Sequence, residues 1–288
     1  AGETKPLTVT ASGAWTAASD QTWLTLSAAS GTGDGSVNVT ATANPGPSRT
    51  AKVTFTSGSI TCEVNVIQAG TGAATNGTTG PLNWNYDAGT KTLTITGTGA
   101  MPDFNPPADR PWDSFRNRIQ TVTIGAGVTT IGEYAFHGCT KLPSITIPNS
   151  VTAIGEHAFG NCWTLTSITL PDGLQTIGEA AFSGCDKLTS ITIPNRVTTI
   201  GESAFYGCKK LPSITIPNGV TTIGKEAFYQ CNTLTSVTIP KSMTTIGVGA
   251  FASCWALKSI TLPNGVTTIE NNTFYDCPRS QADYLYLA

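Results

Sequence analysis

The sequence predicts a mostly β protein with short helical turns, in which an N-terminal β-sandwich precedes a capped solenoid of 23-residue repeats. The first observation is that isoleucine, phenylalanine and cysteine each recur every 23 residues, seven times and without an insertion, between residues 131 and 277. A fixed period of this length is typical of a solenoid, whose units bury their apolar faces only by stacking on one another. The second observation is that apolar and polar side chains alternate over residues 7–68 between turn residues, which is typical of a sandwich.

The overall composition excludes several classes of partner. Charged residues make up 12% of the chain, the net charge is −2 and the pI is about 5.7. We therefore expect no nucleic-acid partner and no anionic-membrane surface, because both need a basic protein surface. The chain has no run of 18 apolar residues, so no transmembrane segment is predicted. The first residues lack the charged and apolar regions of a signal sequence, so we expect a mature or trimmed start.

Residues 1–70 are the predicted sandwich. Val37, Val39 and Phe55 belong to the positions that alternate with polar residues, which places one side of each strand against a core. Asn44 opens a turn that continues with proline and glycine. Many short strands joined by such turns favour two packed sheets.

Part of this sandwich resembles a known family. The features that carry the resemblance lie within residues 13–70 and are Trp15, Trp23-Leu24, Gly31-x-Gly33, Asn44, Arg49 and Val66-Ile67-Gln68. The segment resembles the BACON domain, an immunoglobulin-like sandwich attached to surface and carbohydrate-active proteins of gut Bacteroidetes. The resemblance implies either a carbohydrate-binding module or a spacer. Trp15 and Trp23 are accordingly interpreted either as core residues or as rings that stack on sugars.

Residues 71–80 and 81–118 are predicted to connect the sandwich to the solenoid. Residues 71–80 are small and polar and lack periodicity, which predicts a flexible linker. Residues 81–118 predict an N-terminal cap, because the first coil of a solenoid otherwise exposes its core. Trp112 and Phe115 are expected to plug this open end. A β-hairpin within the cap is predicted to place four side chains on one face, namely Trp84, Tyr86, Leu93 and Ile95.

Residues 119–288 are predicted to hold the solenoid and the C-terminal end. In one representative copy, residues 188–193 predict a strand whose alternate side chains point inward, and Pro194 ends it. The short Glu-Ala-Ala-Phe segment at 179–182 predicts a single α- or 3₁₀-turn. Stacking the seven strands gives one parallel sheet, and the phenylalanine column is expected to be the main packing contact.

The repeat pattern CxxLxxIxIPxxVxxIGxxAFxx resembles the BspA-like, or treponemal-type, leucine-rich repeat. Residues 82–101 and Pro111-Trp112 resemble the segment that precedes such repeats, so the resemblance covers residues 81–277. It implies a surface-exposed bacterial protein. For some members of the family it implies adhesion to host matrix proteins such as fibronectin and fibrinogen, or to other bacteria. It implies no enzymatic activity for the repeat itself.

Seven of the eight cysteines form one column of the repeat, and Cys62 lies in the sandwich. Equivalent side chains on stacked coils run parallel rather than facing each other, and an odd number leaves one thiol unpaired, so disulfides are not favoured. A linear column also does not converge on a metal in the tetrahedral arrangement of zinc. We therefore expect free buried thiols and no cofactor.

The remaining ionisable residues do not form a recognisable catalytic group. His137 and His157 lie at different offsets in adjacent repeats, share no column and have no serine or cysteine partner in register, so we expect neither a metal nor a triad role. An acidic column follows the glycine of four repeats and comprises Glu133, Glu156, Glu179 and Glu202. This position suits the start of a helical turn, and a calcium-binding stripe is the alternative. We do not expect an enzyme.

Two sets of exposed side chains are candidate ligand-binding residues. The first set is an uncharged hydroxyl surface on the strands, expected on the concave face, and it includes Thr146, Thr169, Thr192, Thr215 and Thr238. The second set lies in columns that vary from copy to copy and comprises Trp163, Trp255, Tyr206 and Tyr229. Exposed Trp and Tyr are enriched in binding hot spots. A structural role stays open for both sets, because threonine suits exposed strand positions and variable columns can reflect drift between copies.

These observations lead to one main hypothesis and two alternatives. The main hypothesis is a non-catalytic, secreted or cell-surface bacterial protein, expected to be a monomer, whose solenoid binds a host extracellular-matrix or cell-surface protein. The first alternative is a carbohydrate-binding surface module in which the sandwich binds a glycan. The second alternative is a structural display stalk. The main hypothesis places affinity in residues 81–288, and the first alternative places it in residues 1–70.

Overall fold

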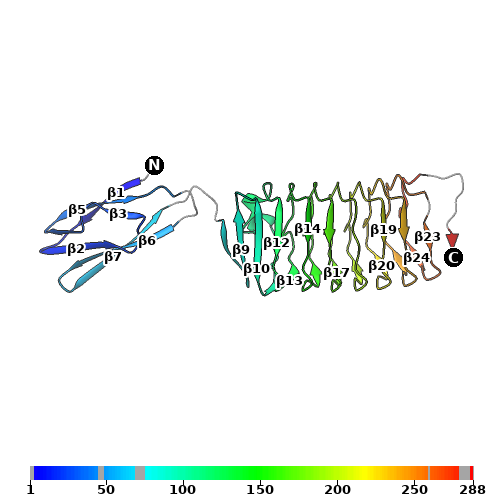
Figure 1. Cartoon of the computed structure of the whole chain (residues 1–288), viewed down its shortest axis with the longest axis horizontal. Coiled ribbons are helices and arrows are strands. Elements are labelled where there is room, and N and C mark those ends of the chain that lie inside the picture. Colours follow the sequence, from blue (N-terminus) through cyan, green and yellow to red (C-terminus); the bar gives the residue numbers. More distant parts are fainter. Residues whose placement is uncertain (1–2, 45–48, 69–74, 259, 279–285, 288) are drawn as a thin grey trace. The chain divides into compact units, whose positions relative to one another are not determined.

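The structure is a computed structural model that describes residues 3–44, 49–68, 75–258, 260–278 and 286–287. Contacts divide the chain into two compact units, Ala1–Ala74 and Thr75–Ala288, and each is described by itself. Figure 1 shows the strands of both units. Residues 71–74 of the predicted linker and most of the C-terminal end lie outside the described residues.

The N-terminal unit contains two antiparallel sheets, with strand orders β1-β5-β3 and β4-β2-β6-β7. Leu24, Val39 and Val53 lie in one core cluster, and Trp15 and Val37 lie in a second. The predicted sandwich is confirmed. Its strands are β1 (Glu3–Val9), β2 (Ala14–Ser19), β3 (Leu24–Leu26), β4 (Ser30–Thr32), β5 (Gly35–Ala41), β6 (Arg49–Ser57) and β7 (Ile60–Gln68).

The two tryptophans of the sandwich are packing residues. Trp15 is buried, its Nε1 donates to the carbonyl oxygen of Gly33 at 3.0 Å, and a Cβ atom at Gly31 would overlap its ring. Trp23 is half-buried against the core, and the Arg49 guanidinium carbon lies 4.2 Å from its ring centroid. These contacts explain the glycine turn and the arginine of the sequence pattern. They favour the core interpretation of both rings over sugar stacking.

The second unit begins earlier than the sequence predicts. Residues 76–79, within the predicted linker, form β8 (Asn76–Thr79), which pairs antiparallel with β9 (Leu82–Asp87). The strand lacks the apolar alternation that marks its neighbours because it lies at the sheet edge. Gly77 lies against the indole of Trp84, where an added Cβ would come within 3.2 Å of the ring nitrogen. This part of the linker prediction is wrong, because backbone pairing defines the strand more than its side chains do.

The cap contains the predicted hairpin, formed by β9 and β10 (Thr92–Gly97). β12 (Thr121–Ile124) pairs parallel with β10, so the sheet passes without a break from the cap into the first coil. The four side chains predicted to share one face are all buried, namely Trp84, Tyr86, Leu93 and Ile95.

The plug of the open end is also confirmed. Two short 3₁₀-helices, η1 (Pro107–Asp109) and η2 (Asp113–Phe115), flank Trp112. Trp112 is fully buried, stacks on Phe136 with centroids 6.3 Å apart, and donates from Nε1 to the carbonyl oxygen of Ala135 at 2.8 Å. Phe115 stacks on Tyr86 with centroids 4.3 Å apart.

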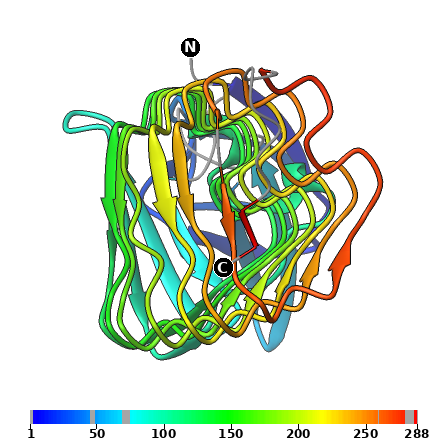
Figure 2. The same cartoon turned by 90° about the vertical axis from the view of Figure 1, so that its right-hand side faces the viewer.

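Each coil of the solenoid has three walls, and Figure 2 looks along the stack and shows the coils nearly superimposed. The first wall is a continuous parallel sheet of eight strands. Its repeat strands pair in register, as Ile154 does with Ile177, and the register shifts only at Gly99–Ala100 in the cap. Its strands are β11 (Gly99–Ala100), β13 (Val128–Ile131), β15 (Ala153–Ile154), β17 (Thr176–Ile177), β18 (Thr199–Ile200), β20 (Thr222–Ile223), β22 (Thr245–Ile246) and β24 (Thr268–Ile269).

The second wall carries the strands that the sequence predicts as one sheet, but the structure divides it. In the coil between the two parts only an isolated bridge from Ser167 to Ser190 remains, and Ile191 is half-buried. Ser150 and Ser242 donate to carbonyl oxygens of the preceding coils at the following corner, whereas Arg196 stands there in the interrupted coil. The two parts consist of β14 (Ser144–Thr146) with β16 (Ser167–Thr169), and of β19 (Ser213–Thr215), β21 (Ser236–Thr238), β23 (Thr261–Leu262) and β25 (Tyr286–Leu287).

The third wall is formed by turns instead of the predicted helical turn. The N–H groups of Ala180, Phe182 and Gly184 donate to carbonyl oxygens of the next coil at 2.7–2.8 Å. A helix would direct these N–H groups along its own axis, so it cannot make these bonds to the next coil. Ala180 and Gly184 have positive φ angles of 47° and 70°, and the equivalent positions of all seven coils are also left-handed. The turns thus form a third hydrogen-bonded ladder along the stack.

The phenylalanine column is the main packing contact, as predicted. Six of its side chains are fully buried. Neighbouring rings stack with centroids 5.2–5.8 Å apart and planes within 19° of each other, from Phe136 to Phe274. Because Trp112 stacks on the first ring, the aromatic column extends into the cap.

All eight cysteines are free. Six in the column are fully buried, and Cys277 in the last coil is half-buried. From the second coil onward each Sγ–H donates to the carbonyl oxygen of the phenylalanine in the preceding coil, as from Cys185 to Phe159 at 3.3 Å. Burial raises the pKa of Cys139, Cys185 and Cys254 to about 12. The column therefore joins coils as buried thiols, and Cys62 is the exposed exception.

Truncating a central phenylalanine should destabilise the solenoid strongly. Phe182→Ala removes a fully buried ring that contacts two neighbours, and a loss of about 3–5 kcal/mol in the free energy of unfolding is expected. Urea unfolding of the whole chain measures it. Phe274→Ala is the matched control, because this half-buried ring has one stacking neighbour and should cost clearly less. Equal losses at both positions would contradict the stacking account.

The thiols should differ sharply in reactivity. In the native protein Cys62 should react rapidly with a thiol reagent, whereas the six fully buried thiols of the column should react only on unfolding, because buried thiols with raised pKa values supply little thiolate. The half-buried Cys277 should react more slowly than Cys62. Denaturant without reductant should release eight titratable thiols. Cys62→Ser should abolish the fast phase. A count clearly below eight in denaturant would show disulfides.

Candidate functional site

The third wall carries the four aromatic candidates, and we call these four residues together with Tyr275 the variable face. Trp163 and Trp255 are 55% and 56% exposed, and Tyr206 and Tyr229 are half-buried. Tyr275, in the same column as the two tyrosines, is 66% exposed. The variable face therefore consists of Trp163, Tyr206, Tyr229, Trp255 and Tyr275.

Two parts of the variable face are held in place by contacts between coils. Tyr206 and Tyr229 stack with centroids 5.0 Å apart and planes 13° apart. Burial, and then the neighbouring Tyr229, raise the pKa of Tyr206 above its usual value. Trp255 donates from Nε1 to Oδ2 of Asp276 in the next coil at 3.1 Å. Both contacts fix the orientation of rings that are otherwise open to solvent.

The ion pairs of this wall also join adjacent coils. Lys209 Nζ lies 3.0 Å from Asp186 Oδ2, and Lys225 Nζ lies 2.8 Å from Glu202 Oε1. All four side chains are at least 40% exposed, so the pairs add little stability. They do neutralise charge beside the tyrosine pair.

The threonine candidates lie on the second wall, apart from the variable face. All five are exposed, and Thr146 pairs in register with Thr169, as Thr215 does with Thr238. Thr192 lies where this wall is interrupted. Thr215 and Thr238 line an open groove of about 580 Å³ with Lys241 and the Pro-Asn corners. The structure thus divides the candidate residues between two walls.

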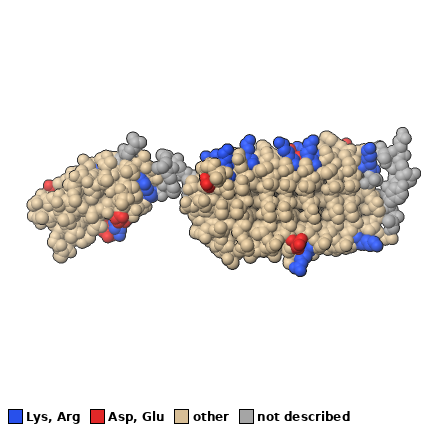
Figure 3. All heavy atoms as spheres, in the orientation of Figure 1, with Lys and Arg blue, Asp and Glu red and all other residues tan. Residues whose placement is uncertain are grey.

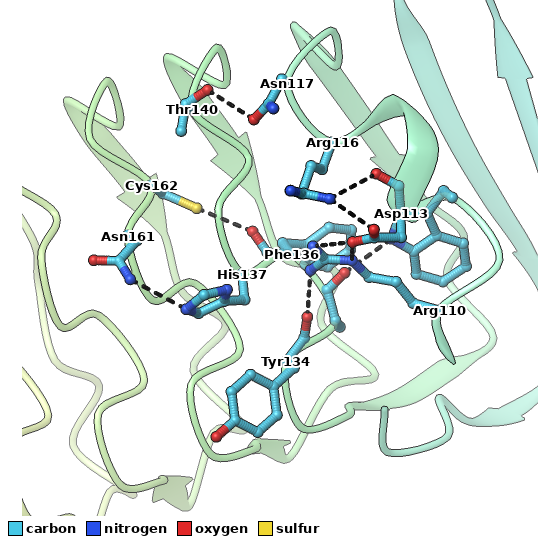
Figure 4. A network of polar contacts seen from close by, with 12 residues as sticks. Arg110, Asp113, Arg116, Asn117, Tyr134, Phe136, His137, Thr140, Asn161 and Cys162 are labelled. Carbon is cyan, nitrogen blue, oxygen red and sulfur yellow. Dashed lines mark hydrogen bonds and ion pairs between the residues drawn. The ribbon is translucent and has the colours of Figure 1, made fainter. Parts of the chain in front are cut away.

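The sequence did not reveal a second groove, between the cap and the first two coils. We call it the cap groove, and Figure 4 shows its polar residues. It is open to solvent and has a volume of about 640 Å³. Of the aromatic candidates only Trp163 lines it. Its lining residues are Pro107, Ala108, Arg110, Asp113, Arg116, Asn117, His137, Gly138, Thr140, Asn161 and Trp163.

Two arginines of the cap groove share one carboxylate. Arg110 is buried, donates from Nε and Nη2 to Asp113 Oδ1 at 3.1 and 2.8 Å, and donates from Nη1 to the carbonyl oxygen of Tyr134 at 2.7 Å. Arg116 donates from Nη1 to Asp113 Oδ2 at 2.6 Å, and its side chain is 43% exposed. Arg110 is therefore fully used in joining the cap to the first coil, whereas Arg116 faces solvent.

The two histidines are closer than their offsets suggest. They share no column, but adjacent columns place the rings of His137 and His157 6.1 Å apart, and both contact Tyr134. Asn161 Nδ2 lies 3.2 Å from His137 Nε2. Burial, followed by the Arg110 guanidinium, lowers the pKa of His137 below its usual value of 6.5. Among the described residues no three His, Cys, Asp or Glu side chains converge on a common metal position.

Two glutamates of the acidic column interact with neighbouring ionisable groups. Burial, and then Asp103 and Glu156, raise the pKa of Glu133 above its usual value. Glu202 is paired with Lys225. The remaining glutamates occupy the same position at the start of the turn in their own coils. The acidic column therefore reflects the repetition of one turn position.

Comparison with known families decides the relationship of the chain. The family described as "BspA type Leucine rich repeat region" matches residues 113–189 and 152–281, with six copies. The chain belongs to the BspA-type leucine-rich repeat family. The BACON family, described as "Putative binding domain, N-terminal", matches residues 13–69. BspA-type repeats and BACON domains are typical of bacterial surface or secreted proteins.

Solved structures of leucine-rich repeat proteins are similar to this chain. A leucine-rich repeat protein from Bacteroides ovatus is 37% identical with a TM-score of 0.54, and the match covers 68% of this chain and 49% of that one. One from Eubacterium ventriosum is 29% identical with a TM-score of 0.54, and the match covers 68% and 61%. The T. pallidum leucine-rich repeat protein is 26% identical with a TM-score of 0.52, and the match covers 64% and 91%.

The chain therefore spans about half and three fifths of the lengths of the first two relatives. A search of curated proteins gives no match. The BspA-type repeat family and these structural neighbours are non-catalytic scaffolds. Among the described residues no helix has the length and apolar character needed to cross a membrane.

The lowered pKa of His137 predicts how the BspA-type solenoid responds to pH. A histidine whose pKa is lower in the folded state stabilises the fold above its unfolded pKa of about 6.5 and loses this contribution as the pH falls. Between pH 7.5 and 5 the parent chain should therefore lose more unfolding free energy than His137→Gln. Thermal or urea unfolding at both pH values measures the difference. The same loss in both proteins would show that His137 is not desolvated in the folded state.

Proposed function

We propose that this chain is a non-catalytic binding protein of the bacterial surface, whose solenoid binds a host extracellular-matrix or cell-surface protein through the variable face. The observation that carries the proposal is the row of aromatic side chains left open to solvent along one wall. Large aromatic rings dominate protein-binding hot spots because they remove much apolar area from water and have few rotatable bonds. Two tryptophans and one tyrosine of this face are more than half exposed.

The scaffold beneath the variable face supports this proposal. The carbonyl oxygens of Tyr206, Tyr229 and Tyr275 accept hydrogen bonds from N–H groups of the preceding coils, and the phenylalanine column packs directly inside. The Tyr206–Tyr229 stack and the Trp255–Asp276 hydrogen bond further limit ring movement. Side chains that are already fixed lose less conformational entropy when a partner binds.

The charge distribution supports a contact dominated by packing. Figure 3 shows few charged side chains over most of the solenoid surface in this view, with Lys and Arg mainly along its upper edge. The column of Trp163 and Trp255 contains two charged residues, Asp186 and Lys209, and these pair with each other. Two ion pairs between coils lie near the tyrosines, and within each pair the positive and negative charges neutralise each other. Apolar and aromatic contacts are therefore the main source of affinity available here.

The family relationship also supports a binding role. A BspA-type repeat follows a BACON domain in one chain, which is the composition of a surface binding module. The sandwich gains no comparable support as the glycan-binding part, because Trp15 is buried and Trp23 packs against the core.

Binding of the whole chain to immobilised fibronectin and fibrinogen tests the proposal. Saturable binding is expected, and Tyr206→Ala/Tyr229→Ala and Trp255→Ala should each weaken it by about tenfold or more, as removal of a hot-spot ring does. Surface plasmon resonance at several protein concentrations measures the affinity.

Thr215→Ala is the control, because this exposed residue lies on the second wall. It should leave the affinity unchanged. Loss confined to Thr215→Ala would transfer the site to the threonine strands. Absence of binding to either protein would reject the matrix-protein assignment.

A further inference from the structure

We propose that the cap groove is a binding site for a sugar that carries a carboxylate, and that it shares only Trp163 with the protein-binding surface proposed above. The groove has two unlike sides. The cap supplies charged and amide side chains, including Arg116 and Asn117, whereas the first two coils supply Thr140, Asn161 and Trp163. An open groove of about 640 Å³ has room for one or two sugar rings.

Arg116 is placed to receive the carboxylate. Only Nη1 of its guanidinium has partners among the described residues, namely Oδ2 and the carbonyl oxygen of Asp113. The edge formed by Nε and Nη2 is the side of the guanidinium that binds a carboxylate through two parallel hydrogen bonds. A Cβ atom at Gly138 would lie 3.8 Å from Cδ and 4.0 Å from Nε of Arg116, so this side chain lies beside the first coil.

The charge of the groove favours an anion. Arg110 and Arg116 face a single carboxylate, Asp113, so the groove contains one more positive than negative charge. Lys141 directly follows the groove residue Thr140 and is exposed. His137 is the remaining ionisable lining residue, and burial, followed by the Arg110 guanidinium, lowers its pKa. An incoming carboxylate therefore meets a positive region with a free donor edge.

The other lining groups match the hydroxyl groups and the C–H face of a sugar. Trp163 is 55% exposed, and an exposed indole face packs well on the C–H face of a pyranose. Among the described residues neither Trp163 Nε1 nor Asn117 Nδ2 has a hydrogen-bond acceptor, and the Asn117 Oδ1 accepts from Thr140 at 3.3 Å. Single donors at the rim of an aromatic surface suit hydroxyl groups.

Trp255 shows by contrast why Trp163 is distinctive. Both follow the cysteine of their coils and both are similarly exposed, but Nε1 of Trp255 is already bonded to Asp276. Trp255 is not among the residues that line the cap groove or the groove on the threonine wall. The pair therefore provides a matched comparison within one chain.

Isothermal titration of the whole chain with tri-galacturonate and with 3′-sialyllactose tests the proposal and separates two sources of the acidic sugar. Binding of at least one of them is expected. Trp163→Ala and Arg116→Lys should each weaken it by about tenfold, since lysine keeps the charge but lacks the paired donors. NMR signals of the His137 ring should move on binding, because this residue lines the groove.

Two control variants keep the test specific. Trp255→Ala and Arg118→Ala should leave sugar binding within about twofold, because the first removes the matched ring and the second removes a nearby exposed charge outside the groove. An unchanged urea midpoint for Arg116→Lys shows that the cap is intact.

The outcomes also distinguish this site from the protein-binding surface. Sugar binding that survives Tyr206→Ala/Tyr229→Ala supports a separate groove, whatever that variant does to fibronectin binding. Equal binding of neutral lactose, equal binding of a tri-aspartate peptide, or no binding of either acidic sugar would overturn the proposal.

Discussion

The structure depends on one constraint, which is that each coil completes its core and its hydrogen bonds only against the next coil. The phenylalanine rings stack along the axis, the thiols donate to carbonyl oxygens of the preceding coil, and two walls pair as strands. The turn wall adds a third ladder of N–H donors directed along the stack. Because all of these contacts share one spacing, an insertion in any coil would disrupt every wall at once, which explains the constant 23-residue period.

The sequence predicted those core residues that recur in every coil because each coil must pack against the next. Every copy has phenylalanine at the position of Phe182 and cysteine at the position of Cys185. Each phenylalanine stacks on its equivalent in the next coil, and each cysteine contacts the same backbone group of the preceding coil. Comparison of the copies was therefore enough to predict the core. The hydrogen bonds of the turn wall could not be predicted in this way, because their donors belong to the backbone and not to side chains. A signal was present nevertheless: Gly138, Asn161 and Gly184 stand before the cysteines, and glycine and asparagine tolerate a positive φ angle. β8 was missed for a related reason, because an edge strand of polar residues has no side-chain period.

The candidate sites divide along the same line. Variation within columns predicted exposure of Trp163 and Trp255, because a column that accepts both tryptophan and aspartate cannot face a core. It did not predict that Asp276 holds one ring while the other lines a groove. That difference arises from a residue that does not repeat: Arg116 belongs to the cap and stands 23 residues before Cys139, at a position where every coil has cysteine. A comparison of copies contains no information about such residues.

The ends and the variable columns are therefore where a repeat protein of this kind can distinguish one ligand from another. A threonine wall offers the same hydroxyl group at every coil, so a ligand shifted by one coil meets the same contacts. The cap breaks this equivalence, because it brings a guanidinium edge and an amide against the first two coils only. Sealing the core requires Trp112 and its neighbours to cross the open end, and the Arg110–Asp113–Arg116 network anchors that crossing. The structural need for a cap thus creates a polar junction found once in the solenoid, and a one-time junction is where a single specific ligand position can exist.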